Sequence, residues 1–327
     1  MLDPTRIMGD LEQARRTYGG RDWPASFADR LTAPLPGFRD IVKIMRNGGF
    51  AAKDLSDAAN IPVTPHDRLP DVHSGQTAVS WIGHATFVVR IGGLTILTDP
   101  VWSDKIPGVR ARLTPPGVPL SGVGHVDAVV ISHNHYDHLD APTIKQIPRD
   151  TPMFIPAMLG YWFRRRGFTN VVELDWWESV RLGEVALEFV PAHHWSRRTL
   201  IDGCKSLWGG WVFSSGDTKV YFAGDTGYGH WFGEIAARHP GLDLALLPVG
   251  AYEPNWFMKP VHMNPAEAVQ ACEDLGAGRM ATMHWGTFVL SAEPLLDPVR
   301  KAAQAWAEAG RPREDLWDLA VGETRFV

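Results

Sequence analysis

Residues 131–140 read ISHNHYDHLD and place four metal-binding side chains within six positions. They follow an apolar run that is typical of a buried strand. His133 and His135 stand two residues apart directly after that strand, so their side chains project to one side and can converge on one cation. Asp137 and His138, beyond the bend, can bind a second cation. Divalent metals such as zinc accept imidazole nitrogen and carboxylate oxygen, so the stretch predicts half of a two-metal site.

Later strand ends offer the other half of this site. His193 and His194 stand in VPAHHW, Asp225 in YFAGDTGY and His284 in ATMHWGT, each just past a run of apolar residues. Asp225 is suited to bridge two cations, because a carboxylate has two oxygens and neutralises part of the charge between them. A chance group of histidines in a polar loop is the alternative. The preceding strand and the downstream candidates argue against it.

The composition excludes several classes of protein. Of the 327 residues, 45% are hydrophobic and 21% are charged, which is typical of a globular chain with a full core. A formal charge of −5 provides no positive field for nucleic acid, so no nucleic-acid partner is expected. Cys204 and Cys272 are too few and too far apart for a disulfide framework or a thiolate zinc site. Any metal must therefore be held by histidines and carboxylates.

The chain divides near residue 76. Residues 1–76 are turn-rich and predict an irregular N-terminal extension wrapped on the core, whereas residues 77–327 predict the catalytic domain. The N-terminal sequence lacks the apolar stretch of a signal peptide, and no run approaches the roughly 18 apolar residues of a membrane span. The expected location is cytoplasmic, with peripheral contact to the inner membrane face left open.

One segment of the extension predicts a basic amphipathic helix. Apolar residues recur at positions i, i+3, i+4 and i+7 over residues 38–45, and basic residues fall between them. The apolar positions are Phe38, Ile41, Val42 and Met45, and the basic positions are Arg39, Lys43 and Arg46. Such a helix can lie on a membrane or pack against the core, and the sequence leaves both open.

Beyond residue 77, short apolar runs predict strands, and helical patterns enter later. The predicted strands cover residues 78–82, 86–91, 94–99, 126–132, 152–156, 171–174, 179–183, 185–192, 206–215, 219–225, 243–250 and 279–286. The predicted helices cover residues 157–167, 230–239, 264–276 and 294–309, with Pro294 in the first turn of the last one. Strands first, then strands alternating with helices, predict an α+β fold of two sheets packed face to face with helices outside.

The chain resembles the metallo-β-lactamase superfamily of αββα hydrolases in four features. These are an HxHxDH motif, a histidine far downstream of it, a GDTG motif, and a histidine toward the C-terminus. It resembles the N-acylphosphatidylethanolamine-hydrolysing phospholipase D branch more closely, through WIGHATFVV, LTDP, PAHHWSRRT, LWGGW, GAYEPNWFMK and HWGTF. The likeness runs from about Ala78 to Trp285 and more thinly to the C-terminus. It implies an αββα sandwich of two mixed β-sheets flanked by helices, with two Zn²⁺ ions per chain.

The resemblance also implies ligands for each metal position. One zinc is implied at His133, His135 and His194, the other at Asp137, His138 and His284, with Asp225 bridging them. His193 stands where the family usually has a glutamine, and the spacing favours His194 as the ligand. In the family, a Gln-His pair lies near the scissile phosphate. This chain has Val261 and His262 there, so the histidine matches and the glutamine is missing.

Other residues have two interpretations each. Asp99 in LTDP resembles an aspartate that orients a metal-binding imidazole through its second N–H, and a turn carboxylate is the alternative. His84 in WIGHAT lies near the site or is a structural histidine. Arg197 and Arg198 bind a substrate phosphate or form surface ion pairs.

Tryptophans that line a crevice are a further expectation, although tryptophan is more often part of a core. The candidates are Trp195, Trp211, Trp231, Trp256 and Trp285, of which Trp195 and Trp256 are assigned to substrate binding.

The activity implied by the resemblance is that of a zinc-dependent phosphodiesterase of the phospholipase D type, acting on N-acylphosphatidylethanolamine-like lipids. Two zinc ions about 3.5–4 Å apart would provide a bridging hydroxide near neutral pH and bind the phosphoryl oxygens. Asp137 would orient this nucleophile. His262 would stabilise the developing charge or protonate the leaving alkoxide.

The same metal chemistry fits a lactonase or a soluble phosphoesterase, because the metals set the reaction type and the pocket sets the substrate. A β-lactamase is a weaker alternative. A non-catalytic metal-binding module and a diiron redox protein are alternatives of a different class. The expected partner is a phospholipid or another small molecule, and a homodimer is left open.

Overall fold

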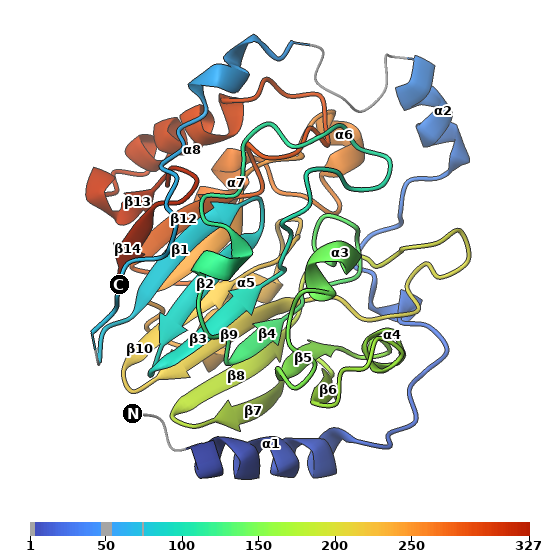
Figure 1. The fold of residues 1–327 in the computed structure, drawn as a ribbon. Helices are drawn as coiled ribbons and strands as arrows, with labels where there is room; N and C mark the ends of the chain where they lie inside the picture. The colour runs from blue at the N-terminus through green and yellow to red at the C-terminus, as the bar shows by residue number, and fades with distance from the viewer. Residues whose placement is uncertain (1–3, 47–53, 74) are drawn as a thin grey trace.

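Two mixed β-sheets packed face to face form the centre of the molecule (Figure 1). The computed structural model describes residues 4–46, 54–73 and 75–327. Within these residues each sheet has seven strands, and each sheet joins an antiparallel part to a parallel part.

The first sheet has the strand order β14-β1-β2-β3-β4-β5-β6. Its strands are β1 (Ala78–Gly83), β2 (Thr86–Ile91), β3 (Leu94–Thr98), β4 (Ala128–Val130), β5 (Met153–Pro156), β6 (Val171–Leu174) and β14 (Thr324–Phe326). Neighbours from β14 to β3 pair antiparallel, and neighbours from β3 to β6 pair parallel. The strands β3 to β6 therefore all end at the same edge of this sheet.

The second sheet has the order β13-β12-β11-β10-β9-β8-β7. Its strands are β7 (Glu178–Leu182), β8 (Val185–Val190), β9 (Gly210–Ser215), β10 (Thr218–Phe222), β11 (Leu244–Pro248), β12 (Arg279–Met283) and β13 (Leu316–Trp317). The strand β9 is antiparallel to both β8 and β10, and β10 to β13 pair parallel. The strands β8, β10, β11 and β12 thus run in one direction and end at one edge.

Alternating side chains give the first sheet two buried faces. Val79 and Phe87 face the second sheet and share a core with Trp211. Val88, next to Phe87 in β2, points to the other face and joins a second core with Phe163 of α4. This period of two is the geometry of a strand, and burial on both faces explains why the strands read as continuous apolar runs.

Helices lie outside the two sheets (Figure 1). They are α1 (Pro4–Tyr18), α2 (Phe38–Arg46), α3 (Ala141–Ile144), α4 (Gly160–Arg164), α5 (Trp231–Arg238), α6 (Asn255–Met258), α7 (Pro265–Asp274) and α8 (Asp297–Glu308). Short 3₁₀ turns cover Ala28–Arg30, Ser56–Asn60, Leu120–Gly122 and Arg313–Asp315. None of these helices, within the described residues, has the length and apolarity that a membrane crossing requires.

Packing shows which strands these helices cover, and α1 closes the edge of the sandwich at which β6 and β7 lie. The helix α7 packs against α8, β11 and β12, while α4 packs against β6 and α1 packs against β6 and β7. The start of α7 is fixed by a capping box, in which Asn264 accepts from the Glu267 N–H and the Glu267 side chain accepts from the Asn264 N–H. The predicted αββα sandwich is confirmed.

The prediction that the chain is irregular from residue 5 to residue 76 was wrong for its first part, because α1 is a regular helix. The signal was present at a spacing of three and four residues. Ile7, Leu11, Ala14 and Tyr18 contact the main core, and Leu11 and Ala14 are buried. The apolar stripe is narrow, and the charged residues between its members lower the mean hydropathy of the segment. The helix was overlooked for this reason.

Several predicted boundaries also needed correction. The last helix begins at Asp297 and not at 294, so Pro298 and not Pro294 stands in its first turn. The helix predicted over 157–167 is only the short α4. The strands β13 and β14 were missed because they are two and three residues long. Such short strands carry no detectable period in the sequence.

The predicted amphipathic helix is present as α2, but its buried side differs from the prediction. Ile44, which was not assigned to the apolar face, is buried, whereas Met45 is exposed. The side chains of Phe38 and Ile41 lie outside the described part of the structure. Lys43 lies with its ammonium 3.9 Å from the ring centre of Trp256 in α6, so α2 contacts the rest of the fold there.

The segment between α1 and α2 is anchored on the loop that follows β8. Phe27 is fully buried in the main core, and its N–H donates to the Cys204 carbonyl at 2.7 Å. Arg30 forms a two-pronged ion pair with Asp175 and lies over the ring of Trp176. The extension is therefore part of the folded core at this point.

We predict that Phe27→Ala lowers the free energy of unfolding by about 3–5 kcal/mol, because it leaves a cavity in a closely packed core. The measurement is denaturant unfolding followed by circular dichroism. Met8→Ala on α1 serves as the control, since Met8 is exposed and its loss should change stability by less than about 0.5 kcal/mol. Equal stability of the two variants would contradict an anchored extension.

Candidate metal centre

Four strand ends bring the candidate ligands together at one edge of the sandwich. His133 follows β4 of the first sheet, whereas His194, Asp225 and His284 follow β8, β10 and β12 of the second sheet. Because β8, β10 and β12 run in the same direction, the residues after them meet at one edge. The site therefore needs both sheets and cannot form from either one alone.

The first group of ligand atoms comes from three histidines and one aspartate. In His133, His135, His194 and Asp225, the candidate ligand atoms all lie within 4.8 Å of one another. His135 Nδ1 lies 2.8 Å from His133 Nε2 and 3.2 Å from His194 Nε2. Asp225 Oδ2 lies 3.9 Å from His133 Nε2 and 3.8 Å from His194 Nε2. Ligand atoms of a tetrahedral zinc site are about 3.3–3.6 Å apart, so these distances fit one cation.

The second group lies next to the first and shares Asp225 with it. Asp225 Oδ2 lies 3.1 Å from His138 Nε2, and Asp225 Oδ1 lies 3.1 Å from His284 Nε2. Asp137 Oδ2 lies 3.5 Å from each of these two imidazole nitrogens. His84 lies beside this group, within the distance of a candidate ligand, and its Nε2 is hydrogen-bonded to Asp137 Oδ2 at 2.9 Å.

The buried atoms that face the second group test whether a cation fits there. His138 Nε2, His284 Nε2 and Asp225 Oδ1 have no hydrogen-bond partner within the described part of the chain. Their contacts near 3 Å have the wrong direction for hydrogen bonds. Buried polar atoms without a partner are rare in folded proteins, and an ion in their midst would satisfy all three. The donors present therefore suit a pair of divalent cations with Asp225 between them.

The electrostatics of the two groups differ. Burial lowers the pKa of His133 and His194 well below 6.5 and that of His135 to about 4. Burial also disfavours charge on His138 and His284, but Asp225 and Asp137 outweigh it, so the pKa of His138 rises well above 6.5 and that of His284 rises to about 9.

The two carboxylates remain ionised despite their burial. Burial raises the pKa of Asp225, but His138 and His284 together hold it well below 3.8. His138 likewise outweighs burial at Asp137 and holds its pKa well below 3.8. A cation bound between these carboxylates would replace the protons of His138 and His284, because metal ligands must be deprotonated.

Residues outside the ligand set hold the imidazoles in place. Asp99 Oδ2 lies 2.7 Å from His138 Nδ1 and accepts from the Ser132 hydroxyl at 2.5 Å. This is the contact by which an aspartate orients a metal-binding imidazole through its second nitrogen. His194 Nδ1 donates to the Val261 carbonyl at 3.0 Å. The backbone provides this contact, so it does not depend on the side chain at position 261.

His193 points away from the metal groups. Its ring Nδ1 lies 2.6 Å from the Thr32 hydroxyl of the N-terminal extension, and its backbone N–H donates to Thr226 Oγ1 at 3.0 Å. Its ring packs so closely on Gly229 that a Cβ there would lie 2.3 Å from His193 Nε2. Adjacent residues of an extended segment leave on opposite sides, which explains the different surroundings of His193 and His194.

His262 lies beside both groups without belonging to the two main ligand sets. Its ring centre is 5.2 Å from that of His194 and 5.5 Å from that of His284. The Nδ1 atom of His262 has no hydrogen-bond partner within the described residues. Burial lowers the pKa of His262 to about 4, so the ring is neutral at pH 7. A neutral imidazole here can present one N–H to a bound molecule.

The four predicted substrate-contact residues lie in different surroundings. Trp195 packs edge-on against His135 with ring centres 5.0 Å apart, and the exposed Arg197 lies over Trp195. The guanidinium of Arg198, in contrast, donates to backbone carbonyls of the chain itself. Trp256, in α6, is partly exposed and contacts Lys43.

Arg198 and Tyr136 join the two ligand loops, a role that was not predicted from the sequence. Arg198 Nη1 donates to the Asn134 and Leu139 carbonyls at 3.1 and 2.7 Å. The Tyr136 hydroxyl donates to the Arg198 carbonyl at 2.9 Å, and the guanidinium lies over the Tyr136 ring. A tyrosine between two ligand positions, together with a basic residue four positions after His194, was the only available signal.

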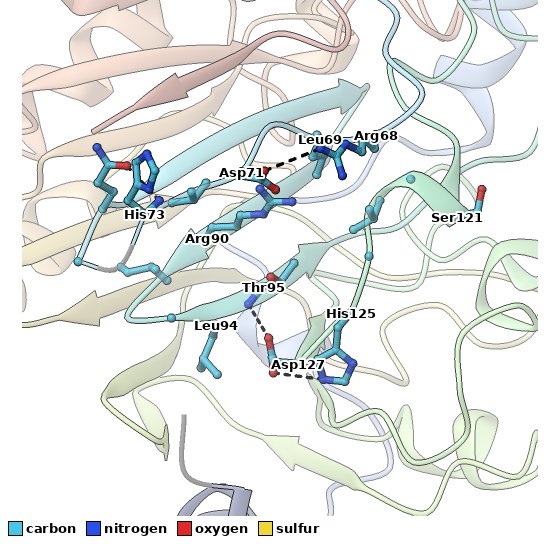
Figure 2. A pocket seen from close by; sticks show the side chains of 18 residues that line it. Arg68, Leu69, Asp71, His73, Arg90, Leu94, Thr95, Ser121, His125 and Asp127 are labelled. Atoms are coloured by element: carbon cyan, nitrogen blue, oxygen red, sulfur yellow. Dashed lines mark hydrogen bonds and ion pairs between the residues drawn. The ribbon is translucent and has the colours of Figure 1, made fainter. Parts of the chain in front are cut away.

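A separate cavity of about 630 Å³ lies at the other end of the first sheet (Figure 2). It lies beside the β2–β3 turn and the residues before β4, where β3 begins. Asp127 there accepts from the Thr95 N–H at 2.8 Å and lies 3.4 Å from His125 Nε2. Because β3 ends next to Asp99, the length of the strand separates this cavity from the metal centre. The cavity therefore takes no part in the site.

Comparison with known proteins places this site in a family. Residues 95–285 match the family model described as Beta-lactamase superfamily domain. N-acyl-phosphatidylethanolamine-hydrolyzing phospholipase D 1 of Caenorhabditis elegans is 37% identical over 340 aligned residues, which cover 96% of this chain and 93% of the relative. An uncharacterized protein of Mycobacterium tuberculosis is 41% identical over 76% of this chain and 68% of its own length.

Solved structures share the fold. The isothiocyanate hydrolase from Delia radicum gut bacteria superposes with a TM-score of 0.62 over 76% of this chain and 98% of that chain, at 20% sequence identity. A likeness at this level of identity concerns the architecture alone. It agrees with the two-sheet sandwich described above.

We predict that His194→Ala and His193→Gln differ sharply. The first change removes a nitrogen from the first ligand group, so metal content should fall below two ions per chain. Turnover should fall by more than the roughly 10- to 100-fold that accompanies loss of a ligand's hydrogen-bond partner. The second change alters the contact with Thr32 and the packing of the ring on Gly229, His230 and Trp231, all outside the ligand groups, so metal content and turnover should stay near those of the unmodified protein. Metal analysis and steady-state kinetics on both variants provide the measurement, and the opposite pattern would move the ligand to His193.

Proposed function

We propose that this chain, which belongs to the metallo-β-lactamase superfamily, uses zinc to hydrolyse N-acylphosphatidylethanolamine-like lipids in the manner of a phospholipase D. The observation that carries the proposal is the match to the C. elegans phospholipase D over 96% of this chain. A match of that extent includes most of the N-terminal extension as well as the ligand positions. It therefore concerns the surroundings of the site and not only its metal-binding motif.

The ligand groups suit the chemistry of a phosphodiester. Two divalent ions held by these residues would provide hydroxide near neutral pH and neutralise charge on the phosphoryl group. Asp137 is ionised and belongs to the second group, where its carboxylate can accept a hydrogen bond from the attacking nucleophile and orient it. The reaction breaks the bond between phosphorus and the ethanolamine oxygen and leaves phosphatidic acid and an N-acylethanolamine.

His262 and Arg197 are the residues we assign to the substrate. His262 lies beside His194 and His284 and has a buried nitrogen with no partner among the described residues, so it can donate to a phosphoryl oxygen or to the leaving oxygen. Arg197 is exposed next to Trp195, and within the described residues no carboxylate pairs with it. A guanidinium there can bind a second phosphate oxygen. Arg198 has no such freedom because two backbone carbonyls occupy it.

Exposed apolar side chains near the site support a lipid substrate. Leu200 and Ile201, on the loop that begins at the metal ligand His194, are 93% and 80% exposed. Met45 of α2 and Trp256 of α6 are also exposed, and α6 leads directly to His262. Exposed apolar side chains that gather in a patch are a feature of surfaces that contact a partner or a membrane. Together with the basic residues of α2, they favour peripheral contact with an anionic bilayer.

A substrate screen tests the proposed activity. We expect N-acylphosphatidylethanolamine in mixed micelles to yield phosphatidic acid and N-acylethanolamine, measured by mass spectrometry. Phosphatidylcholine, a bis-aryl phosphodiester and a lactone should be slower substrates. Asp225→Ala, which removes the shared ligand, is the inactive control. Rapid lactone opening without lipid cleavage would refute the phosphodiesterase and favour the lactonase, and turnover of soluble esters alone would favour the soluble phosphoesterase.

A charge-reversal pair tests the membrane contact separately. Arg39 and Arg46 are exposed on α2, and each basic residue near an anionic surface contributes about 1 kcal/mol to binding. Changing both to glutamate should therefore weaken binding to anionic vesicles at least about 30-fold and lower turnover of vesicle lipid, while a soluble phosphodiester is cleaved as before.

The matched control changes the same net charge on another face. Arg6 and Arg16 lie on α1, which Figure 1 shows at the side of the molecule away from α2. Arg6→Glu with Arg16→Glu should leave vesicle binding much less affected. Equal losses for the two pairs would show that only net charge matters and would contradict a contact through α2.

A further inference from the structure

His84 occupies a buried position between the two sheets, next to the second ligand group. It lies in the turn between β1 and β2 and is 1% exposed. Its Nε2 lies 2.9 Å from Asp137 Oδ2. Its ring packs against that of His284 with centres 4.1 Å apart, and against the edge of Phe288. The ring therefore has one orientation, in which its Nε2 points at the carboxylate.

The backbone of His84 is held at the same point. Its N–H donates to the Thr287 hydroxyl at 2.8 Å, and its carbonyl accepts from the His284 N–H at 3.1 Å and from Trp81 Nε1 at 2.9 Å. The residue has φ +56, in the left-handed region that favours glycine. A histidine at this φ has a conformational cost, and these three backbone hydrogen bonds hold the residue in that conformation.

The direction of the hydrogen bond follows from the chemistry of the two groups. An ionised carboxylate can only accept, so the proton of this contact is on His84 Nε2. The acceptor, Asp137 Oδ2, is also the atom that lies 3.5 Å from both His138 Nε2 and His284 Nε2. His84 thus donates to the same Asp137 oxygen that faces the second metal position. The His84 ring lies on one side of this oxygen, and the second metal position lies on the other. Its Nδ1 has no partner within the described residues, so the contact with Asp137 is the ring's polar interaction there.

We propose that His84 is a positioning residue that fixes the Asp137 carboxylate through its Nε2–H and thereby sets the affinity of the second metal position. A free carboxylate can rotate about its side-chain bonds, and a donor on one lone pair of Oδ2 restricts the direction of the other. Loss of such a partner costs about 10- to 100-fold in metal affinity in comparable sites. The inference rests on the two-metal centre of the proposed function and does not depend on the substrate.

Two substitutions separate the hydrogen bond from the backbone conformation. The amide nitrogen of glutamine reaches about as far as Nε2 of histidine, so His84→Gln can still donate to Asp137. Asparagine adopts a left-handed φ more readily than glutamine, but its amide is too short to reach. We expect His84→Gln to bind two ions with nearly the affinity of the unmodified protein and His84→Asn to bind the second ion about 10- to 100-fold more weakly.

The measurement is zinc affinity by competition with a chromophoric chelator, together with the visible absorption of the Co²⁺-loaded protein. His125→Gln is the matched control, because His125 also pairs with an aspartate but lies in the cavity at the far end of the first sheet. It should leave both readouts unchanged. If His84→Asn bound metal as well as His84→Gln, or if both lost the second ion equally, the proposal would be overturned. The first result would indicate a backbone role and the second a direct ligand.

A measurement on the unmodified protein covers the case in which a variant does not fold. Nitrogen-15 spectra of the zinc-loaded chain report which ring nitrogen of His84 carries the proton. We expect the proton on Nε2, and a proton found only on Nδ1 would overturn the proposal, because a carboxylate cannot donate. Both readouts concern metal and proton positions, so failure of the lipid-hydrolysis proposal would leave them unaffected.

Discussion

A buried aspartate among four imidazoles is the interaction on which this structure depends. Asp225 is almost completely buried, and its two oxygens face His133, His138, His194 and His284. A buried charge is costly unless it is paired or bound to a metal. The ionised Asp225 therefore depends on these imidazoles, or on cations that they help to bind. The four strand ends that deliver these residues come from both sheets, which makes the packing of the sandwich a condition for the site.

Residues that are not ligands maintain this arrangement. Asp99 holds the second nitrogen of His138, and the Val261 carbonyl holds that of His194. Arg198 holds the backbone on both sides of the first histidine loop and is held in turn by Tyr136. Each contact restricts a ring or a loop that would otherwise have several orientations.

The N-terminal extension belongs to the same system. The Thr32 hydroxyl contacts His193, and the Phe27 N–H reaches the loop that carries Leu200 and Ile201. The helix α2 contacts α6 through Lys43 and Trp256. The extension therefore contacts both the loop after β8 and the helix that precedes His262. Metal chemistry is common to many proteins of this fold, so differences in substrate arise from such surroundings and not from the fold itself.

The sequence by itself determined the αββα class, most strands, and the candidate ligands from His133 to His284, because apolar periodicity and the spacing of histidines after strands are local properties. It did not determine α1, the buried face of α2, or the roles of His84, Arg198 and His193. The sequence left open whether His84 lies at the site, and it allowed a phosphate contact for Arg198. Only the tertiary structure decided these points, because each depends on a partner far away in the chain: Asp137 for His84, the Leu139 carbonyl for Arg198 and Thr32 for His193. A side chain's type states what it can bind, whereas its partner is set by how the two sheets pack.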